Sequence, residues 1–296
     1  MTPTQTQYAA FTPPQQVPAQ ETPAQQTPAQ QTLAPYASLP PRQGASRDIA
    51  HTTGIPFRRL LLVEARKLVD TRSGTALLSA IGVLTVAVIL LSFLTMTVND
   101  LTMHSMVGAT STPLSLLLPV LGILTVTTEW TQRTALVTFT LVPRRTDVLL
   151  AKVVVAFIVG LASSVIAVGC AGGLTMLARH GASGSMDMTP TLIAGFVGLT
   201  ALLVIQGVAF GMLFLNTPAA IVCYFAVPFV YSILGFSVAA FKPIAEWTDI
   251  NRTSAVLFSD QTATATQWAQ LGVSVGVWVL LPLVFGMVRT SRKEIS

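Results

Sequence analysis

Long apolar stretches without any charged residue fill most of this sequence after residue 73. Each stretch has about 20 residues or more, which is the length that a helix needs to cross the hydrocarbon core of a bilayer. Strands of a membrane barrel would be about half as long and would alternate apolar with polar residues, and these stretches do not alternate. The sequence therefore predicts an all-α, multi-pass membrane protein with six spanning helices, at about 74–96, 106–127, 153–178, 191–215, 219–240 and 268–288.

The composition agrees with this fold class. Only 10% of the 296 residues are charged, whereas an ordinary soluble domain is about a quarter charged. The two cysteines, Cys170 and Cys223, lie inside apolar stretches and are expected to pack as small hydrophobic side chains. The net charge of +5 does not indicate a nucleic-acid partner, because no basic cluster is interleaved with aromatic residues. The sequence indicates membrane lipids as the main surroundings of the chain instead.

Residues 1–55 have a different composition from the rest of the chain. The stretch "TPAQQTPAQQT" at 22–32 repeats every five residues, and half of the 18 prolines lie within the first 41 positions. Such a segment buries too little apolar surface to offset the entropy lost on ordering. We therefore predict a disordered, Pro/Gln/Thr-rich tail at 1–55.

An amphipathic helix is predicted at 56–72, directly before the first span. On a helical wheel its apolar residues form one stripe opposite basic residues, as in helices that lie in the headgroup layer. Glu64 falls inside this stripe. Its carboxylate either reaches water and pairs with Lys67, or the stripe packs partly on protein and Glu64 meets a cation there. The stripe consists of Phe57, Leu60, Leu61, Ala65 and Leu68.

Lysine and arginine predict the orientation of the chain in the membrane. Basic residues near the ends of spans concentrate on the cytoplasmic side of membrane proteins. Twelve of them lie on the side of the two termini and of the connector between the second and third spans, against three on the other side. We therefore predict that both termini and this connector are cytoplasmic. The three residues on the other side are Arg179, Lys242 and Arg252.

The sequence contains no recognisable catalytic or metal-binding motif. None of the predicted spans holds an ionisable residue, and membrane enzymes and proton-coupled carriers need such groups at depth. The chain also lacks the GxxxxGK[ST] motif that binds ATP phosphates. We predict that it is not an enzyme and has no cofactor or metal of its own. The enzymatic alternative is an external site built from His104, His180 and Asp187.

Charge gathers instead in the connector "TEWTQRTALVTFTLVPRRTDVLLAK" at 128–152. The middle of this connector, "TALVTFTL", is apolar although it belongs to no predicted span. An apolar surface on a polar loop usually marks a site for a partner protein. The charged residues of the connector are Glu129, Arg133, Arg144, Arg145, Asp147 and Lys152.

This connector resembles the cytoplasmic loop of ABC-2 type transporter permeases. In that family an acidic residue ends the second helix, a Gly-Thr pair follows, and a Pro-x-Arg-like turn precedes a lysine that opens the third helix. Arg133 departs from the pattern, since glycine is common at its place. The segment "VEARKLVDTRSG" before the first span also resembles the interfacial elbow helix of the family. The matching places in the connector are filled by Glu129, Thr134, Pro143, Arg145 and Lys152.

The resemblance implies that residues 73–296 form the membrane domain of an ABC exporter in a bacterial plasma membrane, paired with a second permease copy or a paralogue. A separate cytoplasmic ATPase subunit would bind ATP and Mg²⁺ and dock on the connector, with a smaller contact at the turn 214–220. Short re-entrant helices would occupy 241–267. The residues implied in ATPase coupling are Glu129, Arg133, Phe139, Arg144, Arg145 and Lys152, and Glu64 and Lys67 are the implied contact of the elbow helix.

The cargo of such an exporter is expected to be lipophilic or amphiphilic. The predicted spans carry no charge that would hold a charged solute, and Gln206 is the only amide well inside one of them. The alternative function is that of a non-transporting membrane scaffold or sensor subunit that anchors a soluble partner through the same connector.

The charges of the connector also have simpler interpretations. Arg144 and Arg145 could serve only to orient the helices in the membrane. Lys152 could snorkel toward water at the start of the third span. Glu129 could form only a local ion pair with Arg133 one helical turn away.

Overall fold

The structure is a computed structural model that describes residues 55–132, 134, 144–179, 186–258 and 263–292. The tail predicted as disordered lies outside these residues, apart from its last position. All regular structure in the described part of the chain is helical, and six helices are long and apolar enough to cross a membrane. The prediction of an all-α, multi-pass membrane protein with six spans is therefore confirmed.

A shorter helix, α1 (Phe57–Asp70), precedes the spans. Its amphipathic stripe is only partly buried: Leu60, Glu64 and Leu68 are enclosed, whereas Phe57 remains exposed. The six spans are α2 (Arg72–Thr95), α3 (Met103–Thr131), α5 (Arg145–Arg179), α6 (Pro190–Phe214), α7 (Thr217–Ser237) and the continuous stretch Ala265–Arg292.

Several helices extend beyond the predicted apolar stretches and include charged residues at their ends. Helix α3 continues past residue 127 and includes Glu129, and α5 begins well before residue 153 and includes Lys152. The predicted stretches 106–127 and 153–178 themselves contain no charged residue. The physical reason is that an apolar stretch ends at the first charge, whereas backbone hydrogen bonds continue the helix through charged residues that find partners.

Two spans begin directly after a side chain that caps them. The Thr71 side chain accepts a hydrogen bond from the Gly74 backbone N–H at 3.2 Å and caps α2. In the same way, Asn216 accepts from the Ala219 N–H at 3.0 Å and caps α7. Both side chains satisfy backbone donors that the first turn of a helix leaves unpaired.

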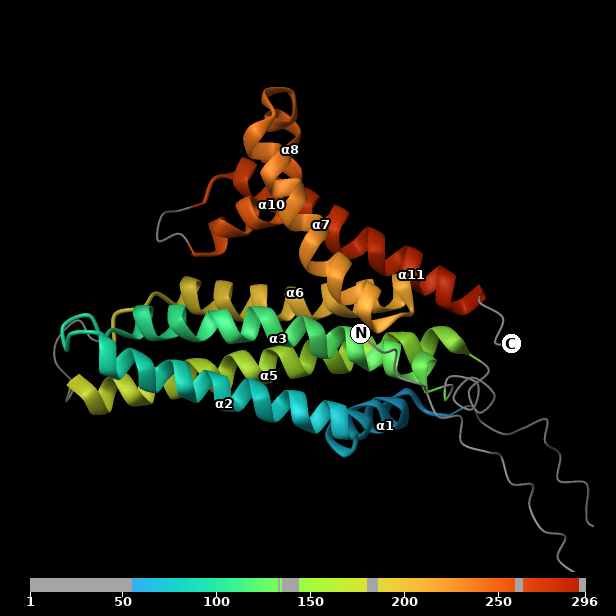
Figure 1. Cartoon of the computed structure of the whole chain (residues 1–296), viewed down its shortest axis with the longest axis horizontal. Helices are drawn as coiled ribbons and strands as arrows, with labels where there is room; N and C mark the ends of the chain where they lie inside the picture. Colours follow the sequence, from blue (N-terminus) through green and yellow to red (C-terminus); the bar gives the residue numbers. More distant parts are fainter. Residues whose placement is uncertain (1–54, 133, 135–143, 180–185, 259–262, 293–296) are drawn as a thin grey trace, which may run out of the picture. The chain divides into compact units, whose positions relative to one another are not determined.

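Helices α3 and α6 are the most enclosed of the spans and run side by side (Figure 1). Their backbones approach closely because glycines lie at the contact. A Cβ atom at Gly207 of α6 would collide with the carbonyl oxygen of Pro119 on α3, and one at Gly122 of α3 would collide with the carbonyl oxygen of Val204. Small residues at such crossings are how spanning helices obtain close packing where lipid offers no hydrophobic driving force.

The last span changes its helical type in the middle. Helix α10 (Ala265–Val275) passes through a π-helical turn at Gly276–Leu280 into α11 (Leu281–Arg292). Pro282 lies two residues after this turn, and proline lacks the N–H that would continue the α-helical hydrogen bonds, so the backbone adjusts there. The Trp278 indole within the turn donates to the Thr248 carbonyl oxygen at 2.6 Å.

Short helices lie between α7 and α10, and the re-entrant character implied for 241–267 stays a prediction. They are η2 (Ala239–Phe241), α8 (Lys242–Thr248), α9 (Ile250–Thr253) and η3 (Ser254–Phe258).

Several connections meet at one end of the helical bundle, which we call the loop end. The Thr217 hydroxyl, at the start of α7, donates to the Thr127 hydroxyl of α3 at 2.8 Å. The Arg145 guanidinium, at the start of α5, donates to the Ser291 carbonyl oxygen of α11 at 3.0 Å. The end of α3 therefore lies beside the α6–α7 turn, and the start of α5 lies beside the end of α11. These are the segments that the distribution of lysine and arginine assigned to one side of the membrane.

Candidate functional site

Four charged side chains from three helices form a buried cluster at the loop end. We call it the charge ring; it consists of Glu64 and Lys67 of α1, Glu129 of α3 and Lys152 of α5. Each lysine contacts both carboxylates, so acids and bases alternate around the ring. Helix α1 is thereby joined to the two helices between which the connector 132–144 runs.

Lys152 is the most enclosed member of the ring, with 3% of its surface exposed. Its ammonium donates to Glu64 Oε2 at 2.6 Å, to Glu129 Oε1 at 2.8 Å and to the backbone oxygen of Thr125 at 3.1 Å. An ammonium has three N–H donors and no acceptor, so all of its hydrogen-bonding capacity is used. The interpretation of Lys152 as a side chain that snorkels toward water is therefore wrong.

Lys67 completes the ring on the more open side. Its ammonium donates to Glu64 Oε1 at 2.8 Å and to Glu129 Oε1 at 2.7 Å, while about a third of the side chain (36%) stays exposed. Burial by itself would lower the pKa of Lys67, but the carboxylates of Glu129 and Glu64 outweigh this effect and hold its pKa above the ordinary value. Lys67 therefore keeps its charge at neutral pH.

The local sequence explains how these side chains reach one another. Glu64 and Lys67 lie three residues apart on α1, so both point to the same face of that helix. Glu129 lies in the last turn of α3 and Lys152 in the third turn of α5, so each remains close to the connector. Glu64 pairs with Lys67, as the first interpretation of the α1 stripe proposed, but it is buried and also meets Lys152 of α5, as the second proposed.

The ring is electrically balanced, with two acids and two bases. Removing an ion from water costs several kcal/mol even after the protein relaxes, and only close and fully hydrogen-bonded partners recover that cost. All four ion pairs are 2.8 Å or shorter, which meets this condition. The cluster therefore tolerates a change in the position of α1 only if α3 and α5 follow.

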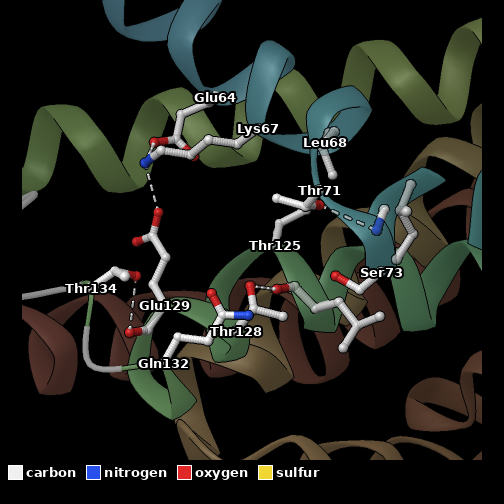
Figure 2. A pocket seen from close by; sticks show the side chains of 13 residues that line it. Glu64, Lys67, Leu68, Thr71, Ser73, Thr125, Thr128, Glu129, Gln132 and Thr134 are labelled. Carbon is white, nitrogen blue, oxygen red and sulfur yellow. Dashed lines mark hydrogen bonds and ion pairs between the residues drawn. The ribbon is translucent and has the colours of Figure 1, made fainter. Parts of the chain in front are cut away.

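A cavity of about 240 Å³ lies beside the ring, among α1, α2 and α3 (Figure 2). Figure 2 shows Glu64 and Lys67 reaching toward Glu129 across one edge of the cavity, with Thr125, Thr128 and Gln132 along α3. The hydroxyls of Thr125 and Thr128 donate to backbone oxygens of their own helix, at 2.7 Å and 2.6 Å. The ring thus forms one wall of a hollow where the elbow-like α1 meets the spans.

The other connector residues implied in coupling lie apart from the ring. Arg144 is exposed immediately before α5, and Arg145 reaches α11 as described above. Arg133 and Phe139 lie outside the described residues, so the local pair between Glu129 and Arg133 stays a prediction. What the structure adds to the predicted set is the Thr125 carbonyl oxygen, which no side-chain pattern could reveal because it belongs to the backbone.

The external residues of the enzymatic alternative come together only in part. His104 and Asp187 line one open hollow, while His180 lies outside the described residues. Among the residues that the structure describes, no three His, Cys, Asp or Glu side chains form a group able to hold a metal ion.

No protein-family model matches this sequence, and a comparison with curated proteins gives no match either.

Proposed function

We propose that this chain is the membrane-spanning permease subunit of an ATP-driven exporter of the ABC-2 type. The alternative function is that of a non-transporting membrane scaffold or sensor subunit. In this proposal, the connector 132–144 is cytoplasmic and carries a separate ATPase subunit that binds ATP and Mg²⁺. A second permease copy or a paralogue completes the membrane pathway in the bacterial plasma membrane, and the cargo is lipophilic or amphiphilic.

The observation that carries this proposal is the charge ring. A partner that pushes on the connector acts on the ends of α3 and α5, since the connector joins Thr131 to Arg145. Glu129 and Lys152 lie on these two ends and hold α1 between them. A displacement at the connector is therefore passed to α3, α5 and α1 together, which is the mechanical property that a coupling loop requires.

The neighbouring contacts extend this linkage to the rest of the bundle. The Arg145 bond to Ser291 joins the start of α5 to the last helix, and the Thr217 bond to Thr127 joins the α6–α7 turn to α3. We infer that closure of the partner ATPase moves these helix ends as one body. The spans then rock against those of the second permease unit and open a path outward.

The deciding experiment is co-purification of the tagged full-length chain from its native membrane, with assay of bound ATP hydrolysis. We expect a P-loop ATPase to accompany the chain. A variant with Phe139→Ala and Arg144→Ala, which leaves the charge ring intact, is expected to insert normally and lose this ATPase or its coupling to export. Lys242→Ala, an exposed change outside the connector, is the matched control.

The possible outcomes separate the two functions. A wild-type chain that retains a soluble partner without nucleotide hydrolysis would favour the scaffold function. A chain that exports its cargo with no attached hydrolase, or whose partner is indifferent to the connector variant, would contradict the proposed coupling.

A further inference from the structure

A second cavity, of about 340 Å³, lies among the spans α3, α6 and α7 and the short helices α9 and η3. None of the described residues that line it carries a charge. Its walls are largely apolar, with Leu199 and Leu203 from α6 and Phe225 and Phe229 from α7. The volume lies within the range of pockets that enclose small organic ligands.

Two polar side chains in this cavity have no partner. Gln206 is 3% exposed and Tyr224 is 6% exposed, and both line the cavity. Within the described parts of the chain, neither the Gln206 amide nor the Tyr224 hydroxyl makes a hydrogen bond. Their polar atoms are not sealed inside packed protein, since the only side-chain atom found both sealed and unpaired among the described residues is the Thr85 hydroxyl. Their polar atoms therefore reach open space, and this cavity is a space that both residues line.

This is unusual for polar groups inside these spans. The buried hydroxyls of Thr110, Thr175 and Thr200 each donate to a backbone oxygen of their own helix, at 2.7–2.9 Å. Hydrocarbon offers no alternative partner, so an unpaired amide or hydroxyl at this depth is costly unless another molecule satisfies it. An amide both donates and accepts, and so does a phenolic hydroxyl, so a single carbonyl or hydroxyl group could bond to both.

The geometry around Tyr224 keeps its hydroxyl in place. The Tyr224 ring makes edge contacts with Phe210 and Phe225, with ring centres 5.6 Å and 4.9 Å apart. Such T-shaped contacts fix the plane of the ring. The lining residues Phe225 and Phe229 are also exposed on the surface of α7, so the cavity borders an apolar part of that surface.

We propose that this cavity is a binding site for an uncharged, lipid-soluble molecule that carries a carbonyl or hydroxyl group, held by Gln206 and Tyr224. The apolar walls enclose the body of the molecule, and the absence of a lining charge excludes ions. This site goes beyond the proposed function, because binding in it requires neither an ATPase nor a second permease copy.

The test uses benzophenone, an uncharged diaryl ketone that attaches to nearby C–H bonds when irradiated. The purified full-length chain in lipid nanodiscs is irradiated at increasing benzophenone concentrations, and the labelled peptides are mapped by mass spectrometry. Labelling of 199–206 and 224–229 is expected to saturate, whereas labelling of the lipid-facing surface of α2 rises in proportion to concentration. Diphenylmethane, which lacks the carbonyl, is expected to compete at least about tenfold less well than the ketone, because the hydrogen bonds to the carbonyl are lost.

Three variants identify the groups responsible. Gln206→Leu and Tyr224→Phe each remove one of the two hydrogen-bonding groups and are expected to reduce the preference for the ketone over diphenylmethane. Leu203→Trp keeps both groups but fills the cavity, and is expected to abolish saturable labelling altogether. Leu90→Trp on the exposed surface of α2 is the matched control and is expected to change neither result. If Gln206→Leu fails to fold, Tyr224→Phe and Leu203→Trp still decide the question.

The proposal is overturned if labelling of α6 and α7 rises linearly like that of α2, or if diphenylmethane competes as well as the ketone. It is equally overturned if Leu203→Trp leaves saturable labelling unchanged. Each of these outcomes would mean that Gln206 and Tyr224 bind only water. None of these outcomes depends on an ATPase, so they bear on the cavity and leave the proposed export function to its own experiment.

Discussion

At the loop end, four charged side chains join α1, α3 and α5. In a second region, the helices α7, α8, α9 and the last span are joined by hydrogen bonds of hydroxyl groups, of an indole and of a single carboxylate. In the second region, which we call the short-helix region (239–258), Tyr231 and Thr248 share a hydroxyl contact of 2.5 Å, and Thr253 and Ser274 share another of 2.5 Å. The one ion pair described there, Arg252 with Glu246 at 3.3 Å, has both side chains about half exposed.

The difference shows that the two regions respond to change in different ways. In the charge ring, removing one member leaves buried charges without a counterion, so the remaining three are affected together. In the short-helix region some contacts also share residues: the Ser232 hydroxyl donates to Asp249 and accepts from the Asn251 amide, and Thr248 contacts both Tyr231 and Trp278. Most of these groups are neutral, so losing one contact does not separate a buried charge from its counterion. A cluster of buried charges suits a region that passes on movement, and a set of mostly neutral contacts suits a region that holds its position.

The largest effect is expected from Lys152→Met, which leaves Glu64 and Glu129 with only the half-buried Lys67 between them. We expect a loss of about 3–5 kcal/mol in the free energy of unfolding, the usual cost of breaking a buried ion pair from one side. Thermal or denaturant unfolding of the purified chain in detergent measures this. The control is Lys242→Met, an exposed lysine in the short-helix region, which is expected to change little. Equal effects of the two changes would remove the contrast between the regions.

A double-mutant cycle tests whether the ring acts as a unit. Glu64→Gln removes one carboxylate charge, and in the presence of Lys152→Met this is the one negative charge that is left uncompensated. The double variant is therefore expected to be more stable than the sum of the single effects predicts, by about 0.5–3 kcal/mol. The free energies of unfolding of the four proteins give this coupling directly. Additive effects would show that Glu64 and Lys152 contribute independently.

A smaller loss is expected from Asp249→Ala in the short-helix region. Asp249 is buried and accepts from the Ser232 hydroxyl at 2.9 Å and from the Asn251 backbone N–H at 3.0 Å, where it caps α9. Loss of such a cap costs about 0.5–2 kcal/mol. Asp187→Ala, an exposed acid, serves as the control in the same unfolding measurement. A loss as large as that of Lys152→Met would mean that this region is also a linked cluster.

The smallest effect is expected from Arg252→Met. Its ion pair with Glu246 is exposed and is screened by salt, so the change in the free energy of unfolding is expected to stay within about 1 kcal/mol. Unfolding is measured at low and at high salt. High salt should reduce the effect of Arg252→Met further, while the effect of Lys152→Met should persist because the ion pairs of Lys152 are shielded from solvent. An Arg252 effect that is large and independent of salt would contradict the contrast between the two regions.

Local properties of the sequence were enough to predict the spans but not their charged ends. Hydropathy summed over a window locates the apolar parts of α3 and α5. It does not show that α3 continues through Glu129 or that α5 already includes Lys152. Whether a charge ends a helix or lies buried in it depends on partners supplied by other helices. The sequence also left open whether Glu64 reaches water or meets a cation on the protein. That choice depended on which helices pack against α1.

The sequence by itself determined that this chain is a six-span helical membrane protein, because the length and apolarity of each span are properties of adjacent residues. Only the tertiary structure decided that Lys152 meets Glu64 from 88 positions away and Glu129 from 23, and that Glu129 also meets Lys67 from 62 positions away. The same holds for Gln206 and Tyr224, whose shared cavity exists only where α6 and α7 pack. Such contacts depend on how helices cross, and helix crossing is set by packing over the whole bundle, which no single stretch of sequence contains.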